Sequence, residues 1–269
     1  MPLPSTAGLS RSEASFVPVS TDQIRIPKAA ELVADTLRRR IIRGEYEPGQ
    51  LLPAESALMA SFDVARTTVR DAVRILESEG LLVVRRGANG GGRVQVPAVA
   101  MVADHAALVL QSRLTSLEDV HAARAMIETP IAGMLAARCD DAAMIAGLRE
   151  ALDAEAASLD DPLKLSRAEG RFHQRLVQLA GSVTIELLSA VTNRIIAQQV
   201  ERDVTERAAT SEVLRHHREA HRAHQRLVDL IAVGAAREAE ALWRRHLEAG
   251  LEHLRGSPEA PTNVLDILA

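Results

Sequence analysis

The stretch that decides the fold is LPAESALMASFDVARTTVRDAVRILESEG, residues 52–80, which predicts two helices joined by a tight turn. In the second helix, apolar residues recur with the spacing of one helical face: Val69, Ala72, Val73 and Leu76. Arginine and threonine lie on the other side, with Arg66, Thr67 and Arg70 near the helix start. Because such side chains can contact guanine, phosphate and the thymine methyl group, this helix is typical of one that enters a DNA major groove. An ordinary helical hairpin with a solvated polar face is the alternative.

The residues after Gly80 favour the DNA-binding interpretation. Short strands are expected at 81–84 and 93–96, separated by the basic, glycine-rich segment RRGANGGG at 85–92. A phosphate-binding nucleotide loop is the competing interpretation, but it needs a following helix, and its P-loop version needs a terminal lysine. Here a strand follows and no such lysine is present. The segment therefore predicts a β-hairpin wing whose arginines can contact phosphates or a minor groove: Arg85, Arg86 and Arg93.

Periodicity and composition divide the chain into four parts. Residues 1–24 lack periodicity and are expected to be a disordered tail, and residues 25–97 are expected to form a winged helix-turn-helix. Residues 98–255 show helical periodicity throughout, and residues 256–269 are expected to be a loose tail. The expected fold class is mainly α, with three helices and a small hairpin wing followed by an all-α antiparallel bundle.

Composition limits the class of protein. Only 2% of the residues are aromatic, so the core must be built from Ala, Leu, Val and Ile, as in closely packed helices. A single cysteine, Cys139, excludes an internal disulfide framework and a multi-cysteine zinc site. No apolar run approaches the roughly 20 residues that span a bilayer, and no signal pattern is present. A cytoplasmic protein with no membrane contact is expected.

The charges are unevenly distributed between the two main parts. Residues 25–100 carry twelve Lys and Arg against nine Asp and Glu, an excess of three positive charges. Because the whole chain carries −4, the remainder carries −7. This division supports polyanion contact that is confined to the first part.

Residues 27–97 resemble the winged helix-turn-helix of the GntR family of bacterial transcription regulators. The run IIRGEYEPGQLLPAESALMASFDVARTTVRDAVRILESEGLLVVRRG follows that family's spacing of G-x-x-x-P-G-x-x-L-P-x-E, then V-x-R-x-x-V-R-x-A-x-x-x-L, then E-G-L. One departure is Ser56, where many relatives have Arg. The resemblance implies that six residues contact double-stranded operator DNA, four on the second helix and two in the wing: Arg66, Thr67, Thr68, Arg70, Arg86 and Gly87.

Histidine carries the chemistry of the second part. Glu169 and His173 are four residues apart and share a helix face, as a chelating pair does. His217, His221 and His224 share a face of a later expected helix, and His246 lies on the last one. A carboxylate and three imidazoles from three helices could hold a divalent metal with positions open for water or ligand. The other histidines are expected to be at the surface or simply hydrogen-bonded: His105, His121, His216 and His253.

This second part resembles the FCD domain, the all-helical effector-binding domain of the FadR-type branch of the same family. In EGRFH, HQRLVDLIAVG and RRHLEAG, the resemblance implies a set of metal ligands: Glu169, His173, His224 and His246. Glu169 stands where Asp is usual, and His221 is the substitute for His224. Zinc is the expected ion, with nickel or manganese as alternatives.

The same resemblance implies a binding residue for an effector. Arg124, in the stretch ARAMIE, would bind the carboxylate of a small metabolite beside the metal. The competing interpretation is a structural pair between Arg124 and Glu128, which are four residues apart on one helix. A further departure from the family pattern is Gly181-Ser182-Val183, where Ser-Gly-Asn is usual.

The leading functional hypothesis is a homodimeric, ligand-responsive transcription factor that acts as a repressor and has no enzymatic activity. A carboxylate metabolite in the helical part would change the affinity of two winged helices for a pseudo-palindromic operator. A metal-dependent hydrolase with an accessory helical domain is the second hypothesis. It lacks support because the sequence shows no Ser-His-Asp order, no H-E-x-x-H and no obvious spare general base. A metal sensor, in which the ion itself is the signal, is the third.

Overall fold

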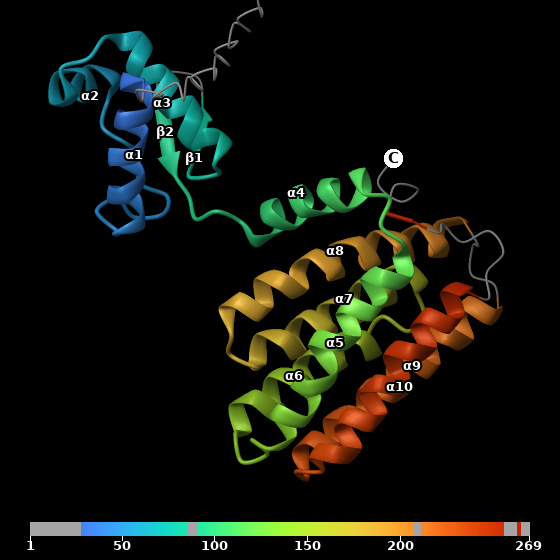
Figure 1. Ribbon diagram of the computed structural model, residues 1–269. Helices are drawn as coiled ribbons and strands as arrows, with labels where there is room; N and C mark the ends of the chain where they lie inside the picture. The colour runs from blue at the N-terminus through green and yellow to red at the C-terminus, as the bar shows by residue number, and fades with distance from the viewer. Residues whose placement is uncertain (1–27, 86–90, 207–210, 256–262, 265–269) are drawn as a thin grey trace, which may run out of the picture. The chain divides into compact units, whose positions relative to one another are not determined.

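The computed structural model describes residues 28–85, 91–206, 211–255 and 263–264. The chain divides into two compact units at the boundary between Val96 and Pro97. The described residues form ten helices and one antiparallel sheet of two strands (Figure 1). The predicted fold class, a winged helix-turn-helix followed by an all-helical bundle, is therefore confirmed.

The first unit consists of three helices and a hairpin: α1 (Ala29–Ile42), α2 (Glu55–Phe62), α3 (Arg66–Ser78), β1 (Leu82–Arg85) and β2 (Gly91–Val94). The apolar face predicted for α3 is buried against α1 through Val69, Ala72 and Leu76. Complete burial of a leucine such as Leu76 stabilises the fold by about 1.5–3 kcal/mol relative to an exposed one. Because this apolar face is turned inward, α3 keeps its arginines on the outer side, where Arg66 and Arg70 are exposed.

Residues with positive φ angles follow the first two helices of this unit. Gly44 lies at φ 76° after α1 and donates its N–H to the carbonyl of Ile41 over 2.9 Å. Glycine suits this position because it has no Cβ to clash in the left-handed region. Asp63 lies at φ 51° and ends α2, which turns the chain into α3. Aspartate tolerates this conformation better than most residues.

The wing is an antiparallel hairpin whose register pairs Leu82 with Val94 and Arg85 with Gly91. The bounds of the strands differ from the predicted ranges 81–84 and 93–96: β1 begins one residue later than predicted, and β2 begins two residues earlier. Gly91 and Gly92 were expected in the loop but lie in β2, where the carbonyl of Gly92 accepts the N–H of Leu52 over 2.8 Å. The glycine-rich composition predicts a loop only where no neighbouring segment supplies hydrogen bonds.

The second unit contains seven helices: α4 (Val99–Ser112), α5 (Leu117–Ala136), α6 (Ala142–Ala156), α7 (Pro162–Leu179), α8 (Val183–Glu206), α9 (Ser211–Ala232) and α10 (Ala236–Arg255). Capping side chains fix several of their starts. The carboxylate of Asp161 accepts the N–H groups of Leu163 and Lys164 over 3.2 and 3.1 Å, and Pro162 is the first helical residue of α7. Asp141 caps α6 in the same way, by accepting the N–H of Met144 over 2.9 Å. These are favourable N-terminal residues because the first N–H groups of a helix lack partners within it.

The core of the second unit lies between α5, α6, α7, α9 and α10. Phe172 and Trp243 are its largest side chains, and both are completely buried. In Figure 1, α9 and α10 run side by side, and α5 packs against α10. This core surrounds the histidines described below, so the packing of five helices positions them.

Asn263 and Val264 differ from the loose tail expected for residues 256–269. Asn263 pairs with Ser116, and Val264 donates its N–H to the carbonyl of Thr115 over 3.0 Å. The side chain of Val264 is completely buried beside Leu117. The other residues of that tail, like residues 1–24, lie outside the described part of the chain. Within the described residues, no helix is long and apolar enough to cross a membrane.

Candidate metal centre and DNA-binding helix

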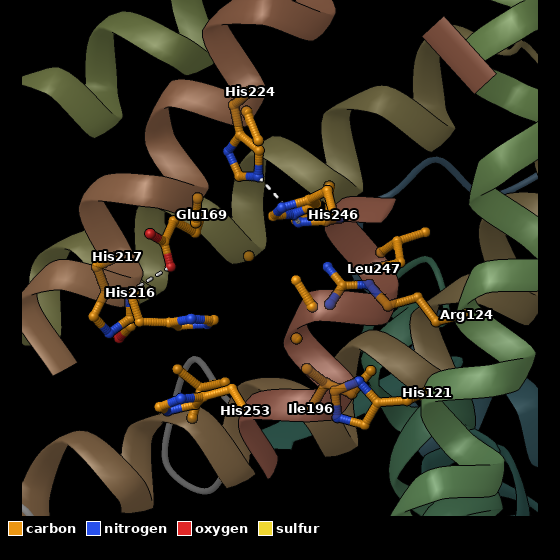
Figure 2. Close-up of a pocket in the computed structure, with 18 of the residues that line it drawn as sticks. His121, Arg124, Glu169, Ile196, His216, His217, His224, His246, Leu247 and His253 are labelled. Atoms are coloured by element: carbon orange, nitrogen blue, oxygen red, sulfur yellow. Dashed lines mark hydrogen bonds and ion pairs between the residues drawn. The ribbon is translucent and has the colours of Figure 1, made fainter. Parts of the chain in front are cut away.

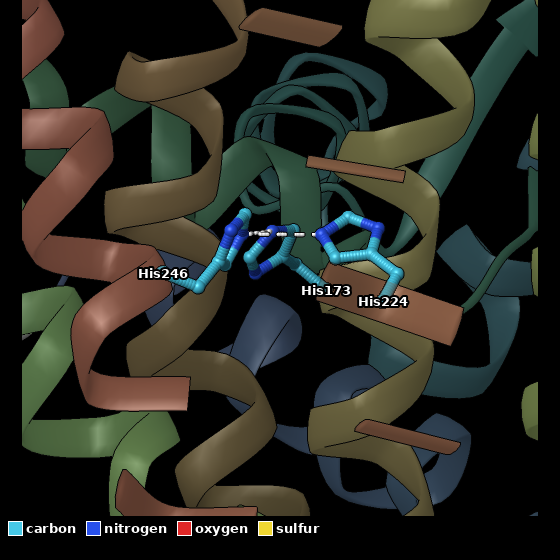
Figure 3. Close-up of side chains that lie close together, drawn as sticks. All are labelled: His173, His224 and His246. Carbon is cyan, nitrogen blue, oxygen red and sulfur yellow. Dashed lines mark hydrogen bonds between the residues drawn. The ribbon is translucent and has the colours of Figure 1, made fainter. Parts of the chain in front are cut away.

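Three histidines from three helices converge in the core of the second unit: His173 on α7, His224 on α9 and His246 on α10 (Figure 3). Their potential ligand atoms all lie within 4.8 Å of one another. The Nε2 atom of His246 is 3.1 Å from Nε2 of His224 and 3.4 Å from Nε2 of His173. The side chains of His173 and His224 are buried, so these nitrogens meet away from bulk water.

Buried carboxylates hold the other ring nitrogens of two of these histidines. Nδ1 of His173 is 2.6 Å from Oε2 of Glu128, and Nδ1 of His224 is 2.7 Å from Oε1 of Glu155. An ionised carboxylate accepts hydrogen bonds only, so it favours the tautomer that carries the proton on Nδ1. Nε2 of His173 and Nε2 of His224 then present bare lone pairs to His246.

This tautomer assignment leaves an electrostatic conflict that a cation resolves. The single Nε2–H that His246 can present donates to one neighbour only, so the Nε2 lone pair of the other neighbour would have no donor in the cluster. A divalent cation accepts all three lone pairs at once. Burial lowers the pKa of His224 to about 4 and holds the pKa of His173 and His246 well below the usual value. The imidazoles are therefore in the neutral form that binds metals.

The two supporting glutamates are completely buried. Burial raises the pKa of Glu155 to about 7, and the hydrogen bond from His221 opposes this rise. Burial also raises the pKa of Glu128, and the nearby charge of Arg124 opposes it. Two imidazoles converge on the carboxylate of Glu155, because Nδ1 of His221 lies 2.9 Å from Oε2. His221, the substitute ligand in the sequence analysis, is thereby engaged with Glu155.

Glu169 lines the same cavity as the three histidines but is not part of their cluster. Its Oε2 atom is 2.8 Å from Nδ1 of His217, as Figure 2 shows. Its Oε1 atom is buried and has no hydrogen-bond partner among the described residues. A buried carboxylate oxygen without a partner is unfavourable unless a cation or a donor meets it. The three clustered imidazoles are ligands that suit a divalent metal ion, and the unpartnered oxygen of Glu169 is a further oxygen donor in the same cavity.

Arg124 and Glu128 form the ion pair that the competing interpretation required, with Nε of Arg124 2.9 Å from Oε1 of Glu128. Arg124 also lines the cavity, and Figure 2 shows its guanidinium near Leu247 and His246. Trp243 completes the surroundings of Glu128, because its Nε1–H donates to Oε2 over 3.2 Å. The two interpretations of Arg124 are therefore compatible: Nε contacts Glu128, and the residue remains at the cavity wall.

The cavity has a volume of about 290 Å³ and lies between α5, α7, α8, α9 and α10. This volume is near the lower end of the range found for small-molecule sites. The cavity is also lined by three histidines that were expected to be at the surface or simply hydrogen-bonded: His121, His216 and His253. Nε2 of His121 lies 3.0 Å from Oε1 of Gln199, and the ring of His216 stacks on His253 with centroids 4.1 Å apart.

Helical spacing could have indicated two of these three histidines. His121 precedes Arg124 by three residues, and His253 follows His246 by seven, so each lies on the cavity face of its helix. His105 conforms to the expectation, since it is exposed on α4 and its Nδ1 lies 2.8 Å from the carbonyl of Met101.

In the first unit, the two arginines at the start of α3 share one carboxylate. Nε of Arg66 donates to Oε2 of Glu55 over 2.6 Å, and Nε of Arg70 donates to Oε1 over 3.1 Å. Their side chains remain 63% and 55% exposed, so both guanidinium groups are accessible. Thr67 is exposed and Thr68 is half-buried. The predicted wing contacts, Arg86 and Gly87, lie outside the described residues.

A winged helix-turn-helix with exposed arginines, together with a helical unit that encloses a ligand-sized cavity, defines a class of bacterial transcription regulators. Residues 29–89 match the family described as bacterial regulatory proteins of the gntR family, and residues 119–249 match the FCD domain. The chain belongs to the GntR family and is a transcriptional regulator with a C-terminal FCD domain.

Known relatives agree with this assignment. The chain is 27% identical over 226 residues to the HTH-type transcriptional repressor NanR of Salmonella newport, covering 82% of this chain and 84% of that one. It has the same identity to the NanR repressor of Salmonella typhi, covering 82% of each chain. The solved structure of Streptococcus agalactiae GntR matches with a TM-score of 0.57 and 25% identity, over 83% of this chain and 99% of that one. Because these relatives are regulators rather than enzymes, the hydrolase hypothesis is set aside.

Proposed function

We propose that this regulator is a homodimeric repressor whose operator affinity is controlled by a small carboxylate bound beside a divalent metal ion. The observation that supports the proposal most is the convergence of three histidine Nε2 atoms at a cavity that Arg124 also lines. The repressor role is supported by the similarity to the NanR proteins, which are transcriptional repressors. Zinc is the proposed ion, because imidazole and carboxylate ligands suit it, and nickel or manganese are the alternatives.

Each residue of the site has a proposed task. His173, His224 and His246 hold the ion, and Glu169 supplies a carboxylate oxygen to it. When bound, the ion supplies positive charge and open positions for an oxygen ligand. Arg124 contributes a second positive group that contacts the effector carboxylate, because a guanidinium matches the geometry of two carboxylate oxygens.

In the first unit, we propose that α3 enters the major groove with its N-terminal end. Four residues of this end would contact the operator, and two wing residues would contact the flanking DNA: Arg66, Thr67, Thr68, Arg70, Arg86 and Gly87. Two copies of the chain would occupy half-sites that are about 34–36 Å apart, or a multiple of that distance. Effector binding changes the affinity for the operator only if the effector binds the DNA-binding conformation and the non-binding conformation of the regulator with different affinities. A coupling free energy of about 1–3 kcal/mol corresponds to a change in operator affinity of roughly 5–150-fold.

A DNA-binding titration tests this function. The full chain is mixed with labelled DNA from upstream of its own gene, in metal-loaded and chelator-treated forms, with and without small carboxylates. We expect a carboxylate to change the affinity of the metal-loaded form by roughly 5–150-fold and to have no effect after chelation. Metal alone should leave the affinity nearly unchanged. A large change caused by metal alone would support the metal-sensor hypothesis, and absence of binding by the folded chain at low salt would contradict the regulator itself.

Replacing Glu155 with glutamine is expected to weaken metal binding by roughly 10–100-fold, the usual effect of losing a partner of a ligand histidine. Glu155 accepts from both His221 and His224, and an amide can accept from only one of them while it turns its NH₂ group toward the other. Competition titration with a metal-binding dye measures the change. Glu150→Gln is the matched control because Glu150 is exposed on the same helix. Equal metal affinities for the two variants would contradict the role of Glu155.

Replacing Glu55 with glutamine is expected to reduce operator specificity. The neutral side chain loses at least one of its arginine partners, so specific affinity should fall roughly fivefold. Removal of a negative charge near the phosphates should at the same time strengthen non-specific binding. Anisotropy titrations with operator and scrambled DNA measure the ratio. Glu47→Gln removes the same charge from an exposed loop position, and an equal loss of specificity there would show that charge alone is responsible.

A further inference from the structure

Two glycines in the interiors of helices line the cavity of the second unit: Gly170 on α7 and Gly250 on α10. Glycine weakens a helix interior relative to alanine, so each position has a reason other than helix formation. A Cβ atom built at either position would meet no atom of the described residues within 4 Å, beyond the helix's own backbone and the chain neighbours. Side-chain packing around Gly170 and Gly250 therefore does not require glycine at either position.

The other helix-interior glycines of this unit behave differently. A Cβ atom at Gly147 would lie 2.7 Å from Nη2 of Arg175, and one at Gly133 would lie 2.7 Å from Cγ of Glu240. Their missing side chains make room for side chains of neighbouring helices. Gly170 and Gly250 instead leave space at the cavity, on the same helix faces as the histidine cluster. Gly170 precedes His173 by three residues, and Gly250 follows His246 by four.

Gly170 also lies between two cavities. A second cavity of about 330 Å³ lies between α4, α7 and α8, and it shares four lining residues with the first: Ser166, Gly170, Asn193 and Ala197. They form two pairs with i,i+4 spacing, one on α7 and one on α8, so small side chains dominate the boundary between the cavities. Oδ1 of Asn193 is buried there without a hydrogen-bond partner among the described residues. An unpartnered acceptor at this boundary suits a ligand that carries a donor group.

We propose that Gly170 and Gly250 are specificity-determining residues that reserve room for the body of the effector. This inference rests on the proposed function, in which the effector's carboxylate lies beside the metal and Arg124. The body extends from the carboxylate past Gly170, toward the second cavity and α4, and along Gly250. The site consequently selects a carboxylate with an extended body that carries hydroxyl or other donor groups, and it binds short acids weakly.

Calorimetric titration of the metal-loaded full chain tests this inference. The probes are acetate, glycerate, gluconate and lactobionate, which carry one carboxylate each on bodies of increasing size. We expect the wild-type affinity to increase from acetate to the larger probes. In Gly170→Ala and Gly250→Ala, affinity for the best-bound larger probe should fall roughly tenfold or more, because an added methyl group occupies space that the ligand needs. Affinity for acetate and for the metal should stay unchanged.

The same variants have an opposite expected effect on stability. Without ligand, each melting temperature should rise by about 1–4 °C, because alanine favours the helix and meets no neighbour. Ala146→Gly, an exposed change on α6, alters helix stability away from the cavity and should leave all affinities unchanged. Two results would overturn this inference and leave the proposed function intact. In one, the wild type binds acetate as tightly as the larger probes; in the other, the two alanine variants bind the larger probes as tightly as the wild type does. A metal-loaded wild type that binds none of the probes would overturn the proposed function with it.

Discussion

Replacement of His246 by alanine is expected to abolish tight metal binding and, with it, the response of DNA binding to the effector. His246 is the shared neighbour in the cluster, because its Nε2 faces both His224 and His173 over 3.1 and 3.4 Å. Loss of a residue that supports a ligand typically weakens metal binding by roughly 10–100-fold, so loss of a ligand itself should exceed about 100-fold. Dialysis against zinc followed by metal analysis, together with dye competition, measures the loss.

Thermal unfolding supplies an independent measurement of the same variant. A ligand at a free concentration about 1,000 times its dissociation constant stabilises the folded state by about 4 kcal/mol. The wild type should therefore melt at a clearly higher temperature with metal than with chelator, and His246→Ala should show almost no difference. His105→Ala is the control, since His105 is exposed on α4 and lies outside the cluster. A His246→Ala chain that retains one tightly bound ion would place the metal elsewhere.

The second large effect is expected for Arg66→Ala and Arg70→Ala in operator binding. Each side chain is exposed at the start of α3 and can contact a base edge or a phosphate. Loss of a base-contacting arginine costs about 1–3 kcal/mol of binding free energy, or roughly 5–150-fold in affinity. Anisotropy titrations with operator DNA at several salt concentrations separate the two kinds of contact. Loss of a phosphate contact weakens binding to all DNA sequences alike and reduces the dependence of affinity on salt concentration. Loss of a base contact instead relaxes specificity at one position of the operator.

Measuring the free energy of unfolding of each arginine variant shows whether a loss of operator binding reflects a lost DNA contact or a destabilised fold. Because both side chains are exposed, the free energy of unfolding should change by no more than about 0.5 kcal/mol. Arg39→Ala removes the same charge from an exposed position on α1 and should change operator affinity far less. If Arg39→Ala weakened binding as much as Arg66→Ala, the affinity would depend on overall charge and not on the position of α3 in a groove.

The sequence was sufficient to predict the helices because their signals are local. The 3.6-residue apolar period marks their buried faces, and residues such as Asp161 and Pro162 mark their starts. All seven helices of the second unit lie within residues 98–255, the stretch whose periodicity predicts helices throughout. The strands of the wing were less predictable, because β2 is also hydrogen-bonded to a distant segment: Val94 donates its N–H to the carbonyl of Gln50, and Leu52 donates its N–H to the carbonyl of Gly92.

The candidate site was predictable only in part for the same reason. Spacing gave several candidate histidines on the expected helices, and the resemblance to the FCD domain selected the three that converge in the structure: His173, His224 and His246. The buried partner Glu155 was not identified, since α6 contains several carboxylates and nothing local distinguishes the one that meets His224, 69 residues later. Glu169 was identified, but its hydrogen bond to His217 depends on the packing of two helices and could not be read from spacing.

Trp243 gives this site an intrinsic optical signal. It is the single tryptophan of the chain, and its ring centroid lies 4.8 Å from that of His173 and 4.7 Å from that of His246. All tryptophan emission therefore originates beside the histidine cluster, where a bound ion would alter the charge around the indole. Metal and effector titrations can consequently be followed on the unlabelled chain, and the same cuvette can contain operator DNA that carries its own dye.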